Sequence, residues 1–336
     1  MINARTSLVV AIVATLATVF AGTSHATTIS GNLAGPNGSH DTWNNPANWD
    51  AGIPSGAVNA VVDTGVAAEA WNTATPMYSG SLTLMQNSSL QMGWTTNFPE
   101  SFNAIGGGPV ILHEGSQIRL RLPFNLDLPE IQLMGDASIH LSPSTSAHHR
   151  TREFEFEISG PGALTVIGNN NNTAVLKAAS TFEGGFIADA DDSWRVQAVV
   201  DGAFGTGDVT FNGRSNGDPA RGASLVIMST DTIDDYATLF LNGGRDHRLA
   251  SKLILNADET IGAFVLDGVN LGVGTFNAAR GLLTSNGDAL ISGNGTLTVT
   301  GITQRPGGAV PEPATAALAL LGSIGLMARR RGRVWA

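Results

Sequence analysis

Short hydrophobic segments recur along most of this chain, and the breaks between them contain Gly, Asn, Asp or Pro. From residue 101 onward the segments follow at intervals of about 8–15 residues, and each has the length of one strand. Typical segments are Ala137–Leu141, Thr173–Ala178 and Ala263–Leu266, and typical breaks are GDAS, SGPG, GNNNN and SGNG. No convincing amphipathic helix stands between them. The pattern therefore predicts an all-β protein built from many short strands.

A β-solenoid and a β-sandwich both give this rhythm, and internal repetition favours the solenoid. SGPGALTVIG at 159–168 and SGNGTLTVTG at 292–301 share the pattern S-G-x-G-x-L-T-V-x-G. The glycines predict a tight turn, and L-T-V predicts a strand whose side chains alternate between two faces. In a solenoid each coil buries its face only against neighbouring coils, so similar coils recur. The β-sandwich remains the alternative.

Composition and charge limit the functions open to the chain. Hydrophobic residues make up 42% of the 336 residues, so a sizeable core can form, and 41 residues are Gly. Cys is absent, which excludes disulfides, thiolate metal sites and a Cys nucleophile. Residues 27–310 carry 13 basic and 27 acidic side chains. Because nucleic-acid binding requires a basic face, we expect no nucleic-acid partner.

Part of the body resembles the autotransporter-associated β-strand repeat. The similarity rests on ISGPGALTV, on TFEGG at 181–185 and on DGAFGTGDVTFNG at 201–213, which follow the order of pieces in that repeat. The segment ETIGAFVLDGVNLGVGTFNA at 259–278, followed by ISGNGTLTV, resembles the closing coils of such proteins. The resemblance covers about residues 155–300. It implies a right-handed parallel β-helix in a secreted, surface-associated protein, and it implies nothing about an enzyme.

Tryptophans concentrate in a turn-rich N-terminal region, residues 27–100. Four of the six lie there: Trp43, Trp49, Trp71 and Trp94. Trp rings set among Asn, Pro and Gly favour a cap that covers the open end of the core. The sharper alternative is a carbohydrate-binding platform, because pyranose rings pack on exposed Trp faces.

The candidate catalytic and metal-binding patterns are weak. In RTREFEFEISG at 150–160, Glu153, Glu155 and Glu157 alternate with two Phe, which predicts a half-buried strand with its Phe face in the core. A carboxylate pair for acid/base chemistry is the alternative. The acidic runs at 189–192 and 231–235 match no known Ca²⁺ loop, so we expect no cofactor and keep Ca²⁺ as an alternative. No His spacing indicates a metal site.

The N-terminus reads as an export signal. Arg5 precedes the apolar run LVVAIVATLATVFAG, and Ser24, His25 and Ala26 offer a cleavage site after Ala26. We therefore expect a signal helix over residues 1–26 that is removed on export.

The C-terminus has three parts in a fixed order, namely a Pro-Glu-Pro motif, a short apolar run and an arginine cluster. The apolar run, Ala314–Ala328, would rise about 22 Å as a helix, which is short for the roughly 30 Å hydrocarbon core. The basic residues would keep the far end cytoplasmic. The motif consists of Pro311, Glu312 and Pro313, and the cluster of Arg329, Arg330, Arg331 and Arg333.

This tail, residues 309–333, closely resembles the PEP-CTERM sorting signal. The resemblance implies export, a transmembrane sorting helix that holds the precursor in the inner membrane, and processing near Pro-Glu-Pro by an exosortase. Passengers of this family are commonly linked to extracellular polysaccharide or biofilm.

These observations predict a signal peptide (1–26), a Trp-rich cap (27–100), a β-helix-like passenger (101–305) and the sorting tail. We expect a structural or adhesive cell-surface protein with no catalysis. The alternatives are a carbohydrate-binding surface protein that uses the four Trp and a β-helix enzyme active on polysaccharide.

Overall fold

The computed structural model describes residues 26–30, 42–70, 77–93, 104–120, 128–141, 151–168, 172–190, 194–213, 223–243, 251–280, 282 and 289–304. These residues form an all-β structure without an α-helix, with short 3-10 turns at η2 (Pro46–Asn48) and η4 (Ala278–Arg280). In this part of the chain no helix has the length and apolar character needed to cross a bilayer. Residues 1–25 of the predicted signal helix and the whole predicted sorting helix lie outside the described residues, whereas Ala26 is the first residue of strand β1.

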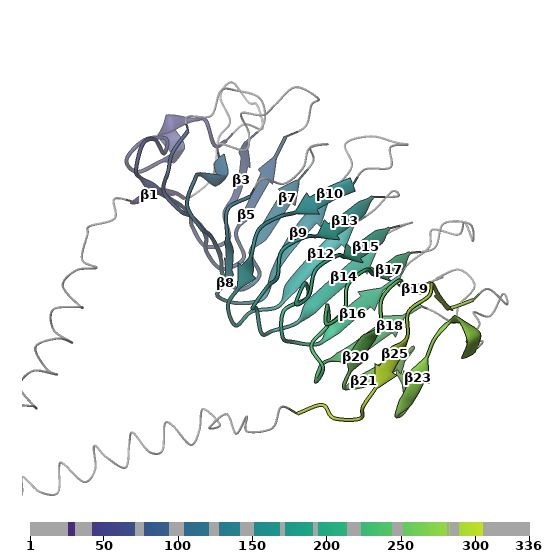
Figure 1. Ribbon diagram of the computed structural model, residues 1–336. Coiled ribbons are helices and arrows are strands. Elements are labelled where there is room, and N and C mark those ends of the chain that lie inside the picture. The colour runs from purple at the N-terminus through teal and green to yellow at the C-terminus, as the bar shows by residue number, and fades with distance from the viewer. Residues whose placement is uncertain are drawn as a thin grey trace, which may run out of the picture.

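One ten-stranded sheet, the long sheet, extends from one end of the described body to the other (Figure 1). In spatial order its strands are β3 (Ala67–Ala70), β5 (Ser89–Met92), β7 (Gln117–Leu120), β9 (Ala137–Leu141), β12 (Leu164–Gly168), β14 (Phe186–Ala190), β16 (Val209–Asn212), β18 (Thr238–Asn242), β21 (Ala263–Leu266) and β22 (Val269–Asn270). All of its pairs are parallel except β21 with β22.

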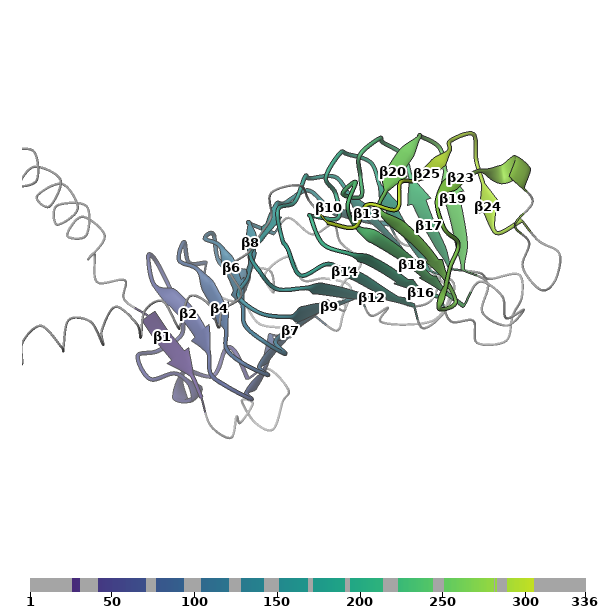
Figure 2. The same cartoon turned by 90° about the horizontal axis from the view of Figure 1, so that it is seen from below.

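Two six-stranded parallel sheets divide the length of the body between them (Figure 2). The N-terminal sheet comprises β1 (Ala26–Ile29), β2 (Asn59–Val62), β4 (Leu82–Leu84), β6 (Val110–Leu112), β8 (Ile131–Leu133) and β11 (Ile158–Ser159). The C-terminal sheet comprises β10 (Thr151–Phe154), β13 (Thr173–Leu176), β15 (Arg195–Ala198), β17 (Ser224–Ile227), β19 (Lys252–Leu255) and β24 (Ile291–Ser292). A small sheet of β20 (Glu259–Ile261), β25 (Leu297–Val299) and β23 (Gly274–Phe276) lies at the C-terminal end of the body.

The chain alternates between these sheets as it advances. From β2 to β9 it passes between the N-terminal sheet and the long sheet, and from β12 to β19 between the long sheet and the C-terminal sheet. Each return places a strand parallel to the one before it, and in the long sheet the register links Leu164, Phe186, Val209, Leu239 and Phe264. This arrangement is compatible with the predicted β-helix. Antiparallel pairing, on which a β-sandwich depends, is limited in the described residues to β21–β22, β23–β25 and one isolated bridge between Ile29 and Trp49.

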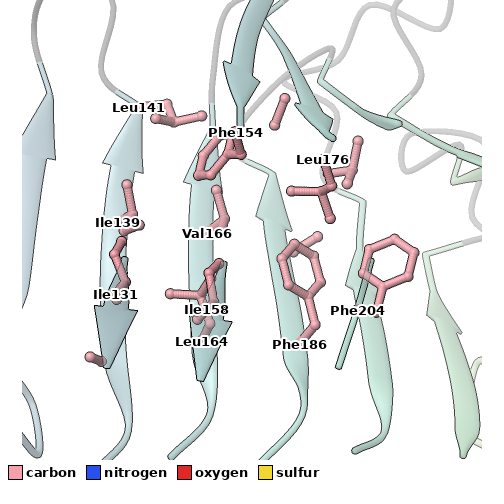
Figure 3. Packing of buried hydrophobic residues seen from close by; sticks show 14 of the residues in the cluster. Ile131, Ile139, Leu141, Phe154, Ile158, Leu164, Val166, Leu176, Phe186 and Phe204 are labelled. Carbon is pink, nitrogen blue, oxygen red and sulfur yellow. The ribbon is translucent and has the colours of Figure 1, made fainter. Parts of the chain in front are cut away.

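The core consists of inward-facing rows that continue from strand to strand. Because side chains alternate along a strand, register-matched positions stack one above the next. One row in the long sheet runs from Ile139 through Val166, Ala188 and Phe211 to Leu241, all buried. Figure 3 shows this packing where the sheets meet, with Phe186 and Phe204 side by side at 4.9 Å between ring centroids.

The three pieces that carry the repeat resemblance lead into three successive strands of the long sheet. ISGPGALTV runs into β12, TFEGG ends directly before β14, and DGAFGTGDVTFNG runs through β16. The glycines of these corners press on the backbone of the neighbouring coil. A Cβ on Gly160 would lie 2.2 Å from the Leu133 carbonyl oxygen, and one on Gly162 would lie 2.0 Å from that of Gly135.

The second near copy of the pattern, residues 292–301, makes the same close contact with a neighbouring coil, but it connects different sheets. A Cβ on Gly293 or on Gly295 would lie 2.0 Å from the carbonyl oxygen of Leu255 or Ala257, respectively. This copy joins β24 to β25, whereas the first joins β11 to β12. The S-G-x-G pattern therefore specifies a corner that touches its neighbour, rather than one fixed place in the fold.

Sheet pairing continues across residue 100, where the sequence predicts a boundary between cap and passenger. β4 pairs with β6 and β5 pairs with β7, so strands on both sides of that point belong to the same sheets. The part that caps the first strands is shorter and centres on residues 42–52. There the backbone N–H of Trp43 donates to the Glu69 carbonyl at 2.9 Å, next to the outermost strand of the long sheet.

Candidate functional site

The sorting residues predicted from the sequence, Pro311 to Pro313 and the four arginines of the tail, lie outside the described residues. Trp71 and Trp94 also lie outside them. The structure therefore places two of the four tryptophans.

Trp43 and Trp49 are core residues at the N-terminal end of the body. Their side chains are 0% and 5% exposed, and the rings pack edge to face with centroids 4.8 Å apart. The Trp49 indole N–H donates to the Trp43 carbonyl at 2.8 Å. This placement agrees with the capping interpretation. It corrects the alternative for these two residues, because a buried ring offers no face for a sugar.

The alternating Glu/Phe segment is a corner and not the single strand that the sequence predicts. β10 ends at Phe154, and β11 begins at Ile158 in a different sheet. Phe154 and Phe156 are buried as expected, at 1% and 6% exposure. The chain turns here because it passes from the C-terminal sheet to the N-terminal sheet while keeping both Phe inside.

Two of the three carboxylates of this corner are paired with a lysine. Lys177 Nζ lies 2.6 Å from Glu153 Oε2 and 3.0 Å from Glu155 Oε1. The hydrogen bonds that the Lys177 ammonium donates to Glu153 and to Glu155 raise the pKa of Lys177. Lys177 and the two glutamates thus form a surface ion-pair cluster between adjacent coils, and solvent-exposed ion pairs contribute little to stability.

A shallow groove of about 500 Å³ lies against three successive corners of the body. The polar and aromatic side chains that line it are Ser180, Thr206, Asp231, Asp234, Asp235 and Tyr236. They come from the connections that follow β13, β15 and β17. We call this feature the acidic groove. Within the described residues no three His, Asp or Glu side chains are grouped so that they could hold a metal ion.

The wall of the groove is a tightly hydrogen-bonded turn. Asp231 has a left-handed backbone, with φ of 53°, which Asp tolerates better than most residues. Its carbonyl accepts the Gly202 N–H at 2.7 Å, and Asp234 Oδ1 accepts the Tyr236 N–H at 3.0 Å. Burial raises the pKa of Asp235, and the neighbouring charges of Asp231 and Asp234 raise it further.

A buried glutamate forms hydrogen bonds with this turn on the side that faces the core. Glu259, 2% exposed, accepts the Thr232 backbone N–H at 3.0 Å and the Thr232 hydroxyl through the same carboxylate oxygen. Burial raises the pKa of Glu259 to about 7, and the hydrogen bonds from Thr232 oppose that shift.

The sequence identifies the acidic run of this groove but not the groove itself. The run DTIDD stands out in the sequence, whereas Ser180, Thr206 and Glu259 carry no signal of their own. They meet the run because coils of different length are stacked, and the pairing of β17 with β15 and β19 sets which corners become neighbours. In the sequence, only the spacing between successive corners indicates that these side chains become neighbours.

Comparison with protein families gives a match in the tail. The match is to the PEP-CTERM protein-sorting motif and covers residues 309–331. It includes Pro311–Pro313 and the arginines at 329–331, so the predicted sorting motif is confirmed. The motif marks an exported protein that is handled at the membrane, and it implies processing by an exosortase. No curated protein and no solved structure matches the chain.

Proposed function

We propose that this chain is an exosortase substrate whose acidic β-helical body serves at the cell surface as a structural or adhesive element, without catalysis of its own. The observation that carries the proposal is the sorting-motif match at residues 309–331. The export signal at residues 1–26 agrees with it, because a chain must leave the cytoplasm before its tail can be processed on the outer face of the membrane.

The physical properties of the tail support a transient anchor. The apolar run at 314–328 is short for a comfortable permanent span, and the arginines beyond it would hold the far end in the cytoplasm. Pro313 cannot continue a helix toward its N-terminal side, since proline lacks the N–H and clashes with the preceding turn. The Pro-Glu-Pro motif would thus present extended backbone to a protease.

The body has the features of a rigid spacer. Acidic side chains at its corners bridge one coil to the next by accepting backbone N–H groups. Glu114 accepts from Asp136 at 2.9 Å, Asp136 from Ala163 at 2.9 Å, and Asp208 from Thr238 at 2.7 Å. Some of the body's acidic side chains therefore have a structural use. A stack held by its sheets and by these bridges would suit a structural or adhesive role.

The sorting proposal is tested by replacing Pro311, Glu312 and Pro313 together with alanine in the native host. The variant is expected to remain full-length in the inner membrane, because the exosortase no longer finds its motif. Pro306→Ala is the matched control, since this proline lies outside the matched residues. Processing of the triple variant at the wild-type rate would overturn the proposal.

A further inference from the structure

The acidic groove has the makings of a ligand site that the sorting function does not use. It has a volume of about 500 Å³, within the range of about 300–1,000 Å³ for small-molecule sites. Its lining comes from three coils, so it offers separated contacts to one extended ligand rather than a single point of attachment.

Ser180 supplies an unused polar group in the groove. Its side chain is only 7% exposed and lines the groove. Within the described part of the chain, its hydroxyl forms no hydrogen bond, although its backbone N–H donates to Gly202 at 3.0 Å. The Ser180 oxygen is not among the fully buried side-chain atoms that lack a partner, so it opens onto the groove. A ligand hydroxyl or amine in the groove could therefore form a hydrogen bond with it.

The remaining polar groups are acceptors and one aromatic ring. The Thr206 hydroxyl reaches the Phe182 carbonyl at 3.4 Å, so its own oxygen stays able to accept. Asp231 and Asp235 are exposed carboxylates, and Tyr236 presents a half-exposed ring beside them. Carboxylates accept hydrogen bonds from hydroxyls, and an aromatic face packs on the C–H face of a sugar ring and attracts a cation.

Charge decides which kind of sugar the groove suits. Three acidic residues, Asp231, Asp234 and Asp235, stand within five positions, and among the described residues no cationic side chain lines the groove. A neutral sugar would satisfy the hydrogen bonds and leave that repulsion in place. A protonated amine would offset it. A metal ion would do the same, but the described carboxylates are not grouped as ligands.

We propose that the acidic groove binds a protonated amino sugar, as a unit of a polycationic glycan. The ammonium group would lie among the Asp carboxylates, the ring would pack on Tyr236, and a hydroxyl would pair with Ser180. A lysine-rich peptide also carries ammonium groups, but it has neither the ring face nor the dispersed hydroxyls that match Tyr236 and Ser180.

The test is calorimetric titration of the full-length protein with a tetramer of glucosamine. Its matched ligand is the tetramer of N-acetylglucosamine, which has the same rings and no charge, and tetralysine is the peptide control. Two double variants are compared. Asp231→Asn combined with Asp235→Asn changes the groove, and Asp63→Asn combined with Thr64→Ser changes the far end of the body and serves as the control. Asn retains the left-handed backbone that Asp231 needs, and Asp234 is left intact because it forms the turn.

The glucosamine tetramer should bind at least tenfold more tightly than the acetylated tetramer, and the affinity should fall with added salt. The groove variant should lose at least tenfold in affinity, whereas the Asp63 variant should bind as the wild type does. Tyr236→Ala should weaken the glucosamine tetramer and leave any tetralysine binding unchanged. The proposal is overturned by no binding at 10 mM, by equal affinity for the two sugars, or by tetralysine binding as tightly in the same groove. None of these outcomes bears on sorting, which has its own readout in the processing of the tail.

Discussion

The residues that define the corners of this protein are glycines that touch a neighbouring coil. At Gly293, φ is 95° and an added Cβ would lie 2.0 Å from the Leu255 carbonyl oxygen. At Gly52, φ is a similar 87°, yet an added Cβ would have no atom within 4 Å. An alanine at Gly52 therefore introduces backbone strain alone, whereas an alanine at Gly293 introduces backbone strain and a clash with the neighbouring coil.

Gly293→Ala is expected to lower the free energy of unfolding by about 2–3 kcal/mol, because a side chain would push β24 away from β19. Gly52→Ala should cost about 1 kcal/mol from the left-handed backbone alone. Urea denaturation of both variants measures the difference. Equal losses would show that the S-G-x-G pattern serves the turn and not the contact with the next coil.

Glu259 makes the stability of the body depend on pH. Its pKa is raised from 4.5 to about 7 in the folded protein, so folding favours its neutral form. The stabilisation is complete below about pH 4.5 and is lost as the pH rises through about 7, since the buried carboxyl must then carry a charge. The full effect is on the order of 3 kcal/mol.

Glu259→Gln should therefore reduce the fall in stability between pH 5 and pH 8, because glutamine keeps an acceptor for Thr232 and has no charge. The measurement is the urea midpoint at both pH values. Glu114→Gln is the control, since that exposed acid also accepts a backbone N–H and should leave the pH dependence unchanged. A Glu259→Gln variant with the wild-type pH dependence would contradict this role.

At the scale of elements, the N-terminal end of the stack needs a cover for its exposed core. Trp43 and Trp49 provide it together, through edge-to-face packing and the bond from the Trp49 indole to the Trp43 carbonyl. The C-terminal end is closed differently, by the antiparallel strands β22 and β23, with Arg280 4.1 Å from the centre of the Phe276 ring.

Trp43→Ala is expected to destabilise the protein by about 3–5 kcal/mol, because it leaves a large cavity over the first coil. Trp49→Phe should cost only about 1 kcal/mol, since it retains the ring packing and loses one hydrogen bond. Urea denaturation checks both. A small effect of Trp43→Ala would mean that residues 42–52 do not cap the core.

The sequence predicts strands best where Gly-rich corners bound them. Ala137–Leu141 and Ala263–Leu266 are predicted with the observed bounds, since their alternation is clear and a Gly lies close before each. The short strands β3, β4 and β5 are missed, because AAEA, LTL and SLQM are too short or too polar to stand out. Their strand conformation comes from pairing with neighbouring coils, which local sequence does not encode.

At the scale of the whole molecule, the function we propose assigns three parts three separate tasks. The N-terminal signal would direct export, the parallel-sheet body would act outside the membrane, and the sorting motif at 309–331 directs processing. The sorting motif can be recognised from the sequence because its three parts follow one another directly along the chain. The groove is built from three successive coils, and the stacking of those coils, which no contiguous motif encodes, brings its side chains together.

Intact-mass analysis of the protein recovered from its native cell envelope tests the sorting account most directly. We expect a mature form that begins after Ala26 and ends near Pro311–Pro313, so that both the signal peptide and the apolar tail with its arginines are gone. A protein that retains every residue through Ala336 as its only mature form would contradict the account.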